Sequence, residues 1–184
     1  MSSFVYYNAV ENKMKVEFKE NFTPTLVNNA NVELIGILKS KGLTISIAES
    51  FTGGNISAKL TAVSGASSVF YEGIVAYNEK AKINRLGVKC DTVKSYHPVS
   101  YEVALEMAQG LLNSTNCQVS ISTTGIAGPN SDESGFPVGL CYVGIGYNDC
   151  VTVYKLNLGR SRQEIVEKGT EIAINLAINT IKNM

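Results

Sequence analysis

Apolar and polar positions alternate along the chain with two different periods, and the changes between them mark out strands and helices. Short runs rich in β-branched residues stand at residues 44–48 (TISIA), 73–77 (GIVAY) and 119–124 (VSISTT). The segments between them place apolar residues at helical spacing. Strands separated by helices pair in parallel, because a crossover helix returns the chain to the same end of the sheet. These three strands are therefore expected to be parallel.

Five helices are expected from the same spacing. They cover about residues 32–41, 56–63, 78–86, 100–112 and 161–181. Capping residues or glycines mark several of their ends. The capping and stop residues are Gly42, Asn78, Gly87, Ser100 and Ser161, the last of which forms a capping box with Glu164.

Two further apolar runs, at residues 138–146 and 151–156, flank the Asn148-Asp149 pair and predict a hairpin. The fold class predicted is therefore α/β: a three-layer α/β/α sandwich on a mixed sheet with a late antiparallel hairpin. Residues 1–31 are irregular apart from an alternating run at 15–18 (KVEF). They are expected to form an N-terminal arm or linker remnant, ahead of one domain at residues 32–184.

Composition agrees with a single globular domain. Of 184 residues, 45% are hydrophobic and 17% charged, which is enough apolar material for a core without disulfides. Sixteen basic and sixteen acidic residues leave a formal net charge of zero. A neutral chain lacks the electrostatic signature of a general nucleic-acid binder. No apolar run reaches the length of a membrane span and no secretory signal opens the chain, so a cytoplasmic protein is expected.

Metal chemistry is not expected. The chain has one histidine, His97, and four cysteines without a C-x-x-C pair. Two of the cysteines, Cys117 and Cys141, stand in or beside apolar runs and are typical of small core residues. The sequence therefore predicts no metal site.

Candidate chemistry gathers at the ends of the three predicted parallel strands. The segments are residues 48–54 (AESFTGG), 76–82 (AYNEKAK) and 123–129 (TTGIAGP). Open α/β sheets bind ligands beyond the carboxyl ends of their strands. If the strands are neighbours, the three segments converge on one crevice.

A serine nucleophile is one interpretation of the first segment. Ser50 stands where a strand turns toward a helix, and backbone amides near Gly53 and Gly54 would stabilise an oxyanion. The base would be Lys82, assisted by Tyr77, as in Ser–Lys variants of the triad. The alternatives are structural: a helix-capping serine, a solvated lysine and a packed tyrosine. His97 is the other possible base, although it stands in a predicted loop.

The same segments supply candidate ligand-binding residues. Glu49 would accept hydrogen bonds from backbone or substrate, small residues would allow close approach of the backbone, and arginine before the last helix suits a phosphate. The alternatives are turn, capping and surface roles. The substrate-binding candidates are Glu49, Thr52, Gly53, Gly54, Thr124, Gly125, Gly128 and Arg162, with Arg160 also close to the start of the last helix.

Four motifs in register together resemble the C-terminal domain of the competence/damage-inducible protein CinA. They are residues 48–54, 73–82, 124–129 (TGIAGP) and 137–139 (PVG), and the resemblance spans about residues 32–182. It implies an α/β/α fold and nicotinamide-nucleotide amidohydrolase activity. The substrate would be nicotinamide mononucleotide, converted to nicotinic acid mononucleotide and ammonia without metal or cofactor.

The resemblance also implies roles for single residues. Ser50 would be the nucleophile, Tyr77 and Lys82 would support it, and Arg162 would contact the substrate. The implied partner is a small nucleotide, and homo-oligomers are expected. Neither nucleic acid nor membrane is implied as a partner.

Several positions depart from the family pattern. Phe51 replaces the usual cysteine, Phe136 the usual lysine and Val166 a frequent arginine, and the loop at residues 130–135 is short. Arg160 stands as an extra residue before Arg162. The amidohydrolase is the leading expectation, and these changes are the reason for an alternative: a nucleotide-binding or regulatory module with little or no catalysis.

Overall fold

Within the described residues (15–20, 25–131, 135–159 and 161–183), the computed structural model has one mixed sheet of six strands. The strands are β1 (Lys15–Lys19), β2 (Ile45–Glu49), β3 (Phe70–Val75), β4 (Val119–Gly125), β5 (Leu140–Tyr147) and β6 (Cys150–Asn157). Their order in the sheet is β1-β6-β5-β4-β2-β3. β5 runs antiparallel to both of its neighbours, and the other pairs are parallel.

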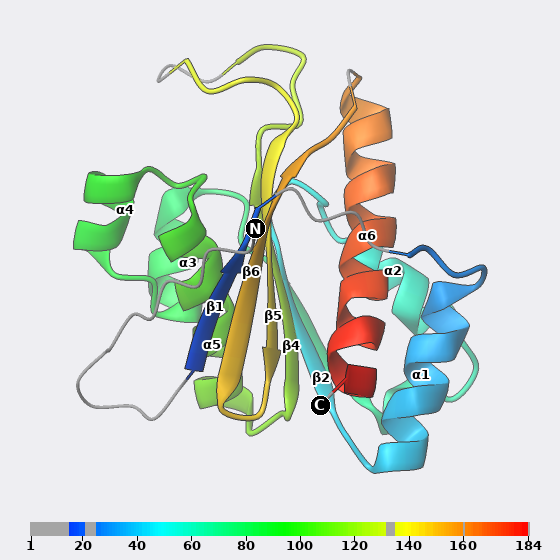
Figure 1. Ribbon diagram of the computed structural model, residues 1–184. Helices are drawn as coiled ribbons and strands as arrows, with labels where there is room; N and C mark the ends of the chain where they lie inside the picture. Colours follow the sequence, from blue (N-terminus) through cyan, green and yellow to red (C-terminus); the bar gives the residue numbers. More distant parts are fainter. Residues whose placement is uncertain (1–14, 21–24, 132–134, 160, 184) are drawn as a thin grey trace.

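Helices cover both faces of this sheet (Figure 1). One face carries α1 (Ala30–Lys41), α2 (Asn55–Thr61) and α6 (Arg162–Asn183), and the other carries α3 (Glu79–Leu86), α4 (Cys90–Tyr96) and α5 (Tyr101–Thr115). A short 3-10 helix, η1 (Ala66–Ser68), precedes β3. The three-layer α/β/α sandwich predicted from the sequence is confirmed.

The expected helix ends are present. The side chains of Asn78 and Ser100 accept hydrogen bonds from the amides of Ala81 and Val103, and Gly42 and Gly87 take left-handed conformations that end α1 and α3. The α4 helix was not expected, because its sequence CDTVKSY has almost no apolar periodicity. Val32, whose helical spacing with Leu34, Ile35 and Leu38 predicts a place on the apolar face of the first helix, is instead 54% exposed.

The core lies on both sides of the central strands. β2 is buried along its whole length, as expected for a strand with a helical layer on each face. The larger cluster includes Ile45 and Ile47 from β2 and Leu34, Ile35 and Leu38 from α1. Cys117 and Cys141 are buried and unpaired, as predicted.

The predicted hairpin is confirmed: its first strand begins two residues later and ends one residue later than expected, and its second strand is one residue longer at each end. β5 and β6 pair from Leu140 with Asn157 to Tyr147 with Cys150. Asn148 takes a left-handed conformation with φ 51°, which asparagine tolerates better than most residues.

The N-terminal arm contributes an edge strand to the sheet. β1 pairs in parallel with β6, and Val16 packs in a cluster with Val151 and Val153. Phe18 meets the ring of Tyr101 edge-on. The arm therefore packs on the domain at residues 15–19, whereas its residues 1–14 lie outside the described part of the chain. The proposed division between residues 31 and 32 stays a prediction.

Strand order places the candidate segments together. β2 lies between β3 and β4, and all three run parallel. The chain leaves β2 through α2 toward β3 on one side, and returns through α5 to β4 on the other. A change of direction of this kind opens a crevice at the carboxyl ends of the strands.

Candidate functional site

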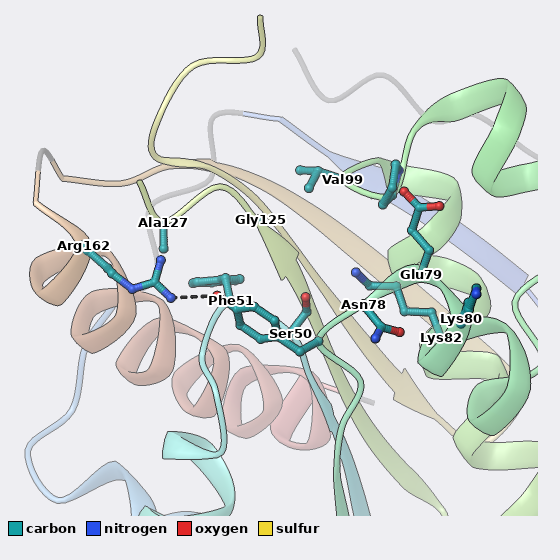
Figure 2. A pocket seen from close by; sticks show the side chains of 12 residues that line it. Ser50, Phe51, Asn78, Glu79, Lys80, Lys82, Val99, Gly125, Ala127 and Arg162 are labelled. Atoms are coloured by element: carbon teal, nitrogen blue, oxygen red, sulfur yellow. Dashed lines mark hydrogen bonds between the residues drawn. The ribbon is translucent and has the colours of Figure 1, made fainter. Parts of the chain in front are cut away.

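A cavity of about 610 Å³ lies at the carboxyl ends of β2, β3 and β4 (Figure 2). It brings together five of the residues proposed from the sequence, namely Ser50, Tyr77, Lys82, Gly125 and Arg162. The other residues that line it are Phe51, Asn78, Glu79, Lys80, Pro98, Val99 and Ala127. The three strand-end segments therefore do converge, and α6 adds Arg162 from the far end of the sequence.

Ser50 occupies the first position of the turn that follows β2. Its amide donates to the carbonyl oxygen of Thr123 at 3.0 Å and to the Thr123 Oγ1 at 3.2 Å. These bonds tie the turn to β4, and the residue is only 6% exposed. Figure 2 shows the side chains of Ser50 and Lys82 pointing toward one another across the cavity.

Lys82 is buried although it stands on a helix. Its residue is 3% exposed, which excludes the solvated surface position considered above. Burial disfavours the ammonium form and lowers the pKa of Lys82 from 10.5 to about 8, while the charge of Glu79, one turn earlier on α3, opposes this shift. A lysine with such a pKa has a useful neutral fraction near pH 7 to 8, as a general base requires.

Arg162 bridges the mouth of the cavity. Its Nη2 donates to the hydroxyl oxygen of Tyr77 at 2.7 Å, and its Nη1 donates to the carbonyl oxygen of Gly128 at 2.8 Å. Residues from the segment after β3, the loop after β4 and α6 therefore meet at one guanidinium group. Tyr77 is 57% exposed, so its phenol lies at the entrance.

Glu49 serves the turn that carries Ser50. Its carboxylate is fully buried and accepts hydrogen bonds from the amides of Gly54 and Ile56 at 3.0 Å each. It also accepts from the amide and the hydroxyl of Ser57, at 2.8 and 2.7 Å. The N-terminus of α2 is thus already occupied by a negative charge of the protein itself.

This arrangement revises the expected oxyanion donors. The Gly54 amide donates to Glu49, and the Gly53 amide donates to the carbonyl oxygen of Ser50 at 3.1 Å. Neither glycine lines the cavity. Their role is in the turn, where Gly53 and Gly54 take positive φ angles of 61° and 96°.

The hydroxyl groups of two threonines proposed to bind substrate are also hydrogen-bonded within the protein. The hydroxyl of Thr52 shares a hydrogen bond of 2.8 Å with that of Thr123, and the Thr124 hydroxyl donates to the Pro98 carbonyl oxygen at 2.7 Å. Neither is among the residues lining the cavity, nor is Gly128, which contributes only its carbonyl oxygen to Arg162.

Sequence reasoning did not single out several residues of the cavity wall. Glu79 and Lys80 follow the predicted cap Asn78, so the helix signal already placed them beside Tyr77. Pro98 and Val99 come from the loop between α4 and α5, whose course depends on the unexpected helix α4.

The remaining candidates lie elsewhere or outside the described residues. His97 accepts a hydrogen bond from the Val99 amide through Nδ1 at 3.1 Å, and its ring packs edge-on against Phe136. Arg160 and residues 132–134 of the short loop are outside the described part of the chain.

In the described segments, no cluster of three His, Cys, Asp or Glu side chains suits a metal ion. The helices described there include none that is long and apolar enough to cross a membrane.

Comparison with known proteins gives a consistent family. The model of the CinA C-terminal domain matches residues 28–181. A CinA-like protein of Kosmotoga olearia is 44% identical over 142 residues, which are 77% of this chain and 34% of that protein. A relative from Clostridium acetobutylicum is 40% identical over 175 residues, which are 95% of this chain and 43% of its own. The chain spans between 34% and 43% of the length of the first four curated relatives.

Solved structures agree. A competence/damage inducible protein of Agrobacterium tumefaciens is 32% identical with a TM-score of 0.77, over 85% of this chain and 98% of that one. A CinA superfamily protein of Klebsiella pneumoniae shares the fold with a TM-score of 0.82 at 24% identity, over 86% of this chain and all of its own.

Proposed function

The chain belongs to the CinA C-terminal domain family, and we propose that it is an amidohydrolase acting on nicotinamide mononucleotide. The products would be nicotinic acid mononucleotide and ammonia. The observation that carries the proposal is the pairing of Ser50 with the buried Lys82 in one cavity. No cofactor is required for this chemistry, because the nucleophile and the base are both side chains.

The proposed reaction begins with attack of the Ser50 hydroxyl on the amide carbon. Neutral Lys82 takes the serine proton as the C–O bond forms, and the carbonyl oxygen becomes an oxyanion. The resulting Lys82 ammonium then gives its proton to the leaving nitrogen as the C–N bond breaks. Ammonia departs, and an acyl-enzyme ester remains on Ser50.

Water completes the cycle. Lys82, again neutral, takes a proton from a water molecule as the water oxygen attacks the ester carbon. Lys82 returns that proton to the Ser50 oxygen as the acid is released. The Phe51 amide follows Ser50 and donates no hydrogen bond within the described part of the chain. We assign the oxyanion to this amide, in place of the glycine amides that the sequence suggested.

Arg162 would bind the phosphate of the substrate. A guanidinium group suits bidentate contact with phosphate oxygens, and Lys80 adds a second cation to the cavity wall. The hydrogen bond that Arg162 donates to Tyr77 holds the guanidinium group at the entrance of the cavity. Tyr77 would therefore act first through Arg162, in addition to its expected support of the base.

The alternative is a binding or regulatory module. It is favoured by the aromatic Phe136, which packs against His97 on the loop that supplies Pro98 and Val99 to the cavity. Such a module would hold the mononucleotide without turnover.

One experiment separates these functions. Purified protein is incubated with nicotinamide mononucleotide, ammonia and nicotinic acid mononucleotide are quantified, and binding is measured by calorimetry. Equal release of the two products supports the amidohydrolase. Binding without turnover supports the regulatory module, and absence of both overturns the assignment of the substrate. Homo-oligomers and a cytoplasmic location stay predictions.

The pH dependence of turnover is expected to follow Lys82. Its pKa of about 8 means that activity rises with pH through this value, since only the neutral amine accepts the serine proton. Replacing Glu79 with glutamine removes a charge that raises this pKa, so the rising limb should move to lower pH. The measurement is kcat against pH, with exposed Glu171→Gln as control. A limb that does not move in Glu79→Gln would contradict the assigned base.

Arg162→Gln is expected to weaken substrate binding far more than catalysis. Loss of a charge-assisted contact worth about 1.5–3 kcal/mol raises KM by about ten- to a hundredfold. The matched control is Arg85→Gln, at an exposed position of α3 outside the cavity wall. Initial rates over a range of mononucleotide concentrations separate KM from kcat, and an unchanged KM would remove Arg162 from the phosphate site.

A further inference from the structure

Gly169 stands in the middle of α6, where glycine is a poor choice. Glycine inside a helix costs roughly 1 kcal/mol relative to alanine. A Cβ atom at this position would lie 2.4 Å from Cε2 and 2.6 Å from Cζ of Phe51. The missing side chain therefore makes the space that the Phe51 ring occupies.

The other side of the ring meets a second glycine. A Cβ atom on Gly125, at the end of β4, would lie 3.0 Å from Cδ1 of Phe51 and 2.6 Å from Sγ of Cys141. The ring is thus held in a slot between β4 and α6. Phe51 is 3% exposed and belongs to the main hydrophobic cluster.

This slot connects two parts of the cavity that are far apart in sequence. Phe51 directly follows Ser50, so the ring is anchored to the turn that carries the nucleophile. Gly169 follows Arg162 by seven residues on α6, which is about two helical turns and about 10 Å along the same side of the helix. Figure 2 shows Phe51 between Ser50 and Arg162 on the cavity wall.

We propose that Phe51 is a positioning residue: its ring, packed against Gly169, fixes the distance between Ser50 and Arg162. The proposal rests on the function proposed above, because this distance matters when one substrate is held by its amide end at Ser50 and by its phosphate end at Arg162. A rigid ring in a slot of two glycines sets this separation. A flexible side chain at position 51 would leave the Ser50 turn and α6 free to shift against one another.

The test uses the variants Gly169→Ala, Phe51→Leu and the double variant. The new methyl group of Gly169→Ala displaces the ring, and kcat per folded molecule should fall by about tenfold or more, since a misplacement near 1 Å can cost about a hundredfold. KM for the mononucleotide should rise in parallel. Leucine lacks the two ring atoms that the methyl group would meet, and in the double variant the methyl group fills the space that these atoms leave. The double variant should therefore recover most of kcat, whereas Phe51→Leu alone leaves that space empty and should lower it.

The matched control is Gly36→Ala in α1, where an added Cβ meets nothing within 4 Å. It should leave kcat and KM unchanged. Loss of kcat in Gly169→Ala with recovery in the double variant supports the proposal. An unchanged kcat per folded molecule, or no recovery, overturns it, because a purely structural role would alter only the folded fraction.

Two further outcomes are also decisive. If Gly169→Ala does not fold, Phe51→Leu alone must lower kcat, and an unchanged kcat overturns the proposal. If the wild type releases no ammonia, the proposed function fails separately. Crystal structures then decide the positioning role through the distance from Ser50 Oγ to the Arg162 guanidinium. This distance must change in Gly169→Ala and return to the wild-type value in the double variant. If Gly169→Ala does not fold, the distance must change in Phe51→Leu, and an unchanged distance refutes the role.

Discussion

Ser50→Ala is expected to reduce ammonia release from nicotinamide mononucleotide by at least about 10³-fold, the scale of loss when a nucleophile is removed from a catalytic unit. The reason is that no other described side chain of the cavity wall can replace it. The lining holds no cysteine or threonine, and Tyr77 already accepts a hydrogen bond from Arg162. Binding of the mononucleotide should change little, because Arg162 and the cavity wall stay in place.

The measurement is single-turnover release of ammonia, together with mass spectrometry for an acyl-enzyme on the wild type. Ser67→Ala is a suitable control, since Ser67 is exposed and outside the cavity wall. Equal ammonia release by wild type and Ser50→Ala would show that Ser50 is not the nucleophile.

Glu49→Ala is expected to give the largest loss of stability, about 3–5 kcal/mol. The substitution leaves three amides and one hydroxyl at the partly buried start of α2 without their acceptor, and each unsatisfied group costs about 1–3 kcal/mol before relaxation and water entry. It also removes a negative charge from a helix N-terminus. For a chain of this size the melting temperature should fall by about 10 °C.

Urea unfolding measures this loss directly, with Glu171→Ala on the exposed side of α6 as the control. The control should change stability by less than about 0.5 kcal/mol. A loss below about 1 kcal/mol in Glu49→Ala would show that water replaces the carboxylate, and the turn would then not depend on it.

The sequence predicted the architecture well because its signals are local. Asn78 and Ser100 cap their helices as expected, and two apolar runs on either side of Asn148-Asp149 predicted the hairpin. The convergence of Ser50, Tyr77 and Lys82 needed one further assumption, that the strands are neighbours. The strand order β4-β2-β3 satisfies it.

What sequence reasoning missed depends on contacts between distant segments. For Glu49 the sequence left both backbone and substrate open as hydrogen-bond partners, and only the folded turn shows that its carboxylate faces α2. The bond from Arg162 to Tyr77 joins residues 85 positions apart, and no spacing rule anticipates it. Phe51 could be noted as unusual for the family, but its fit against Gly169 is visible only when α6 is packed on the sheet.

The occupied N-terminus of α2 has a consequence for the salt dependence of the proposed substrate binding. In many α/β proteins, main-chain amides at such a helix start hold the phosphate of a nucleotide in a sheltered place. Here Glu49 fills that place, so under the proposed function recognition of a phosphate would fall to the exposed side chains of Arg162 and Lys80. Mobile ions screen such surface charges within about 8–10 Å at physiological salt, so capture of the proposed anionic substrate would depend on the surrounding electrolyte.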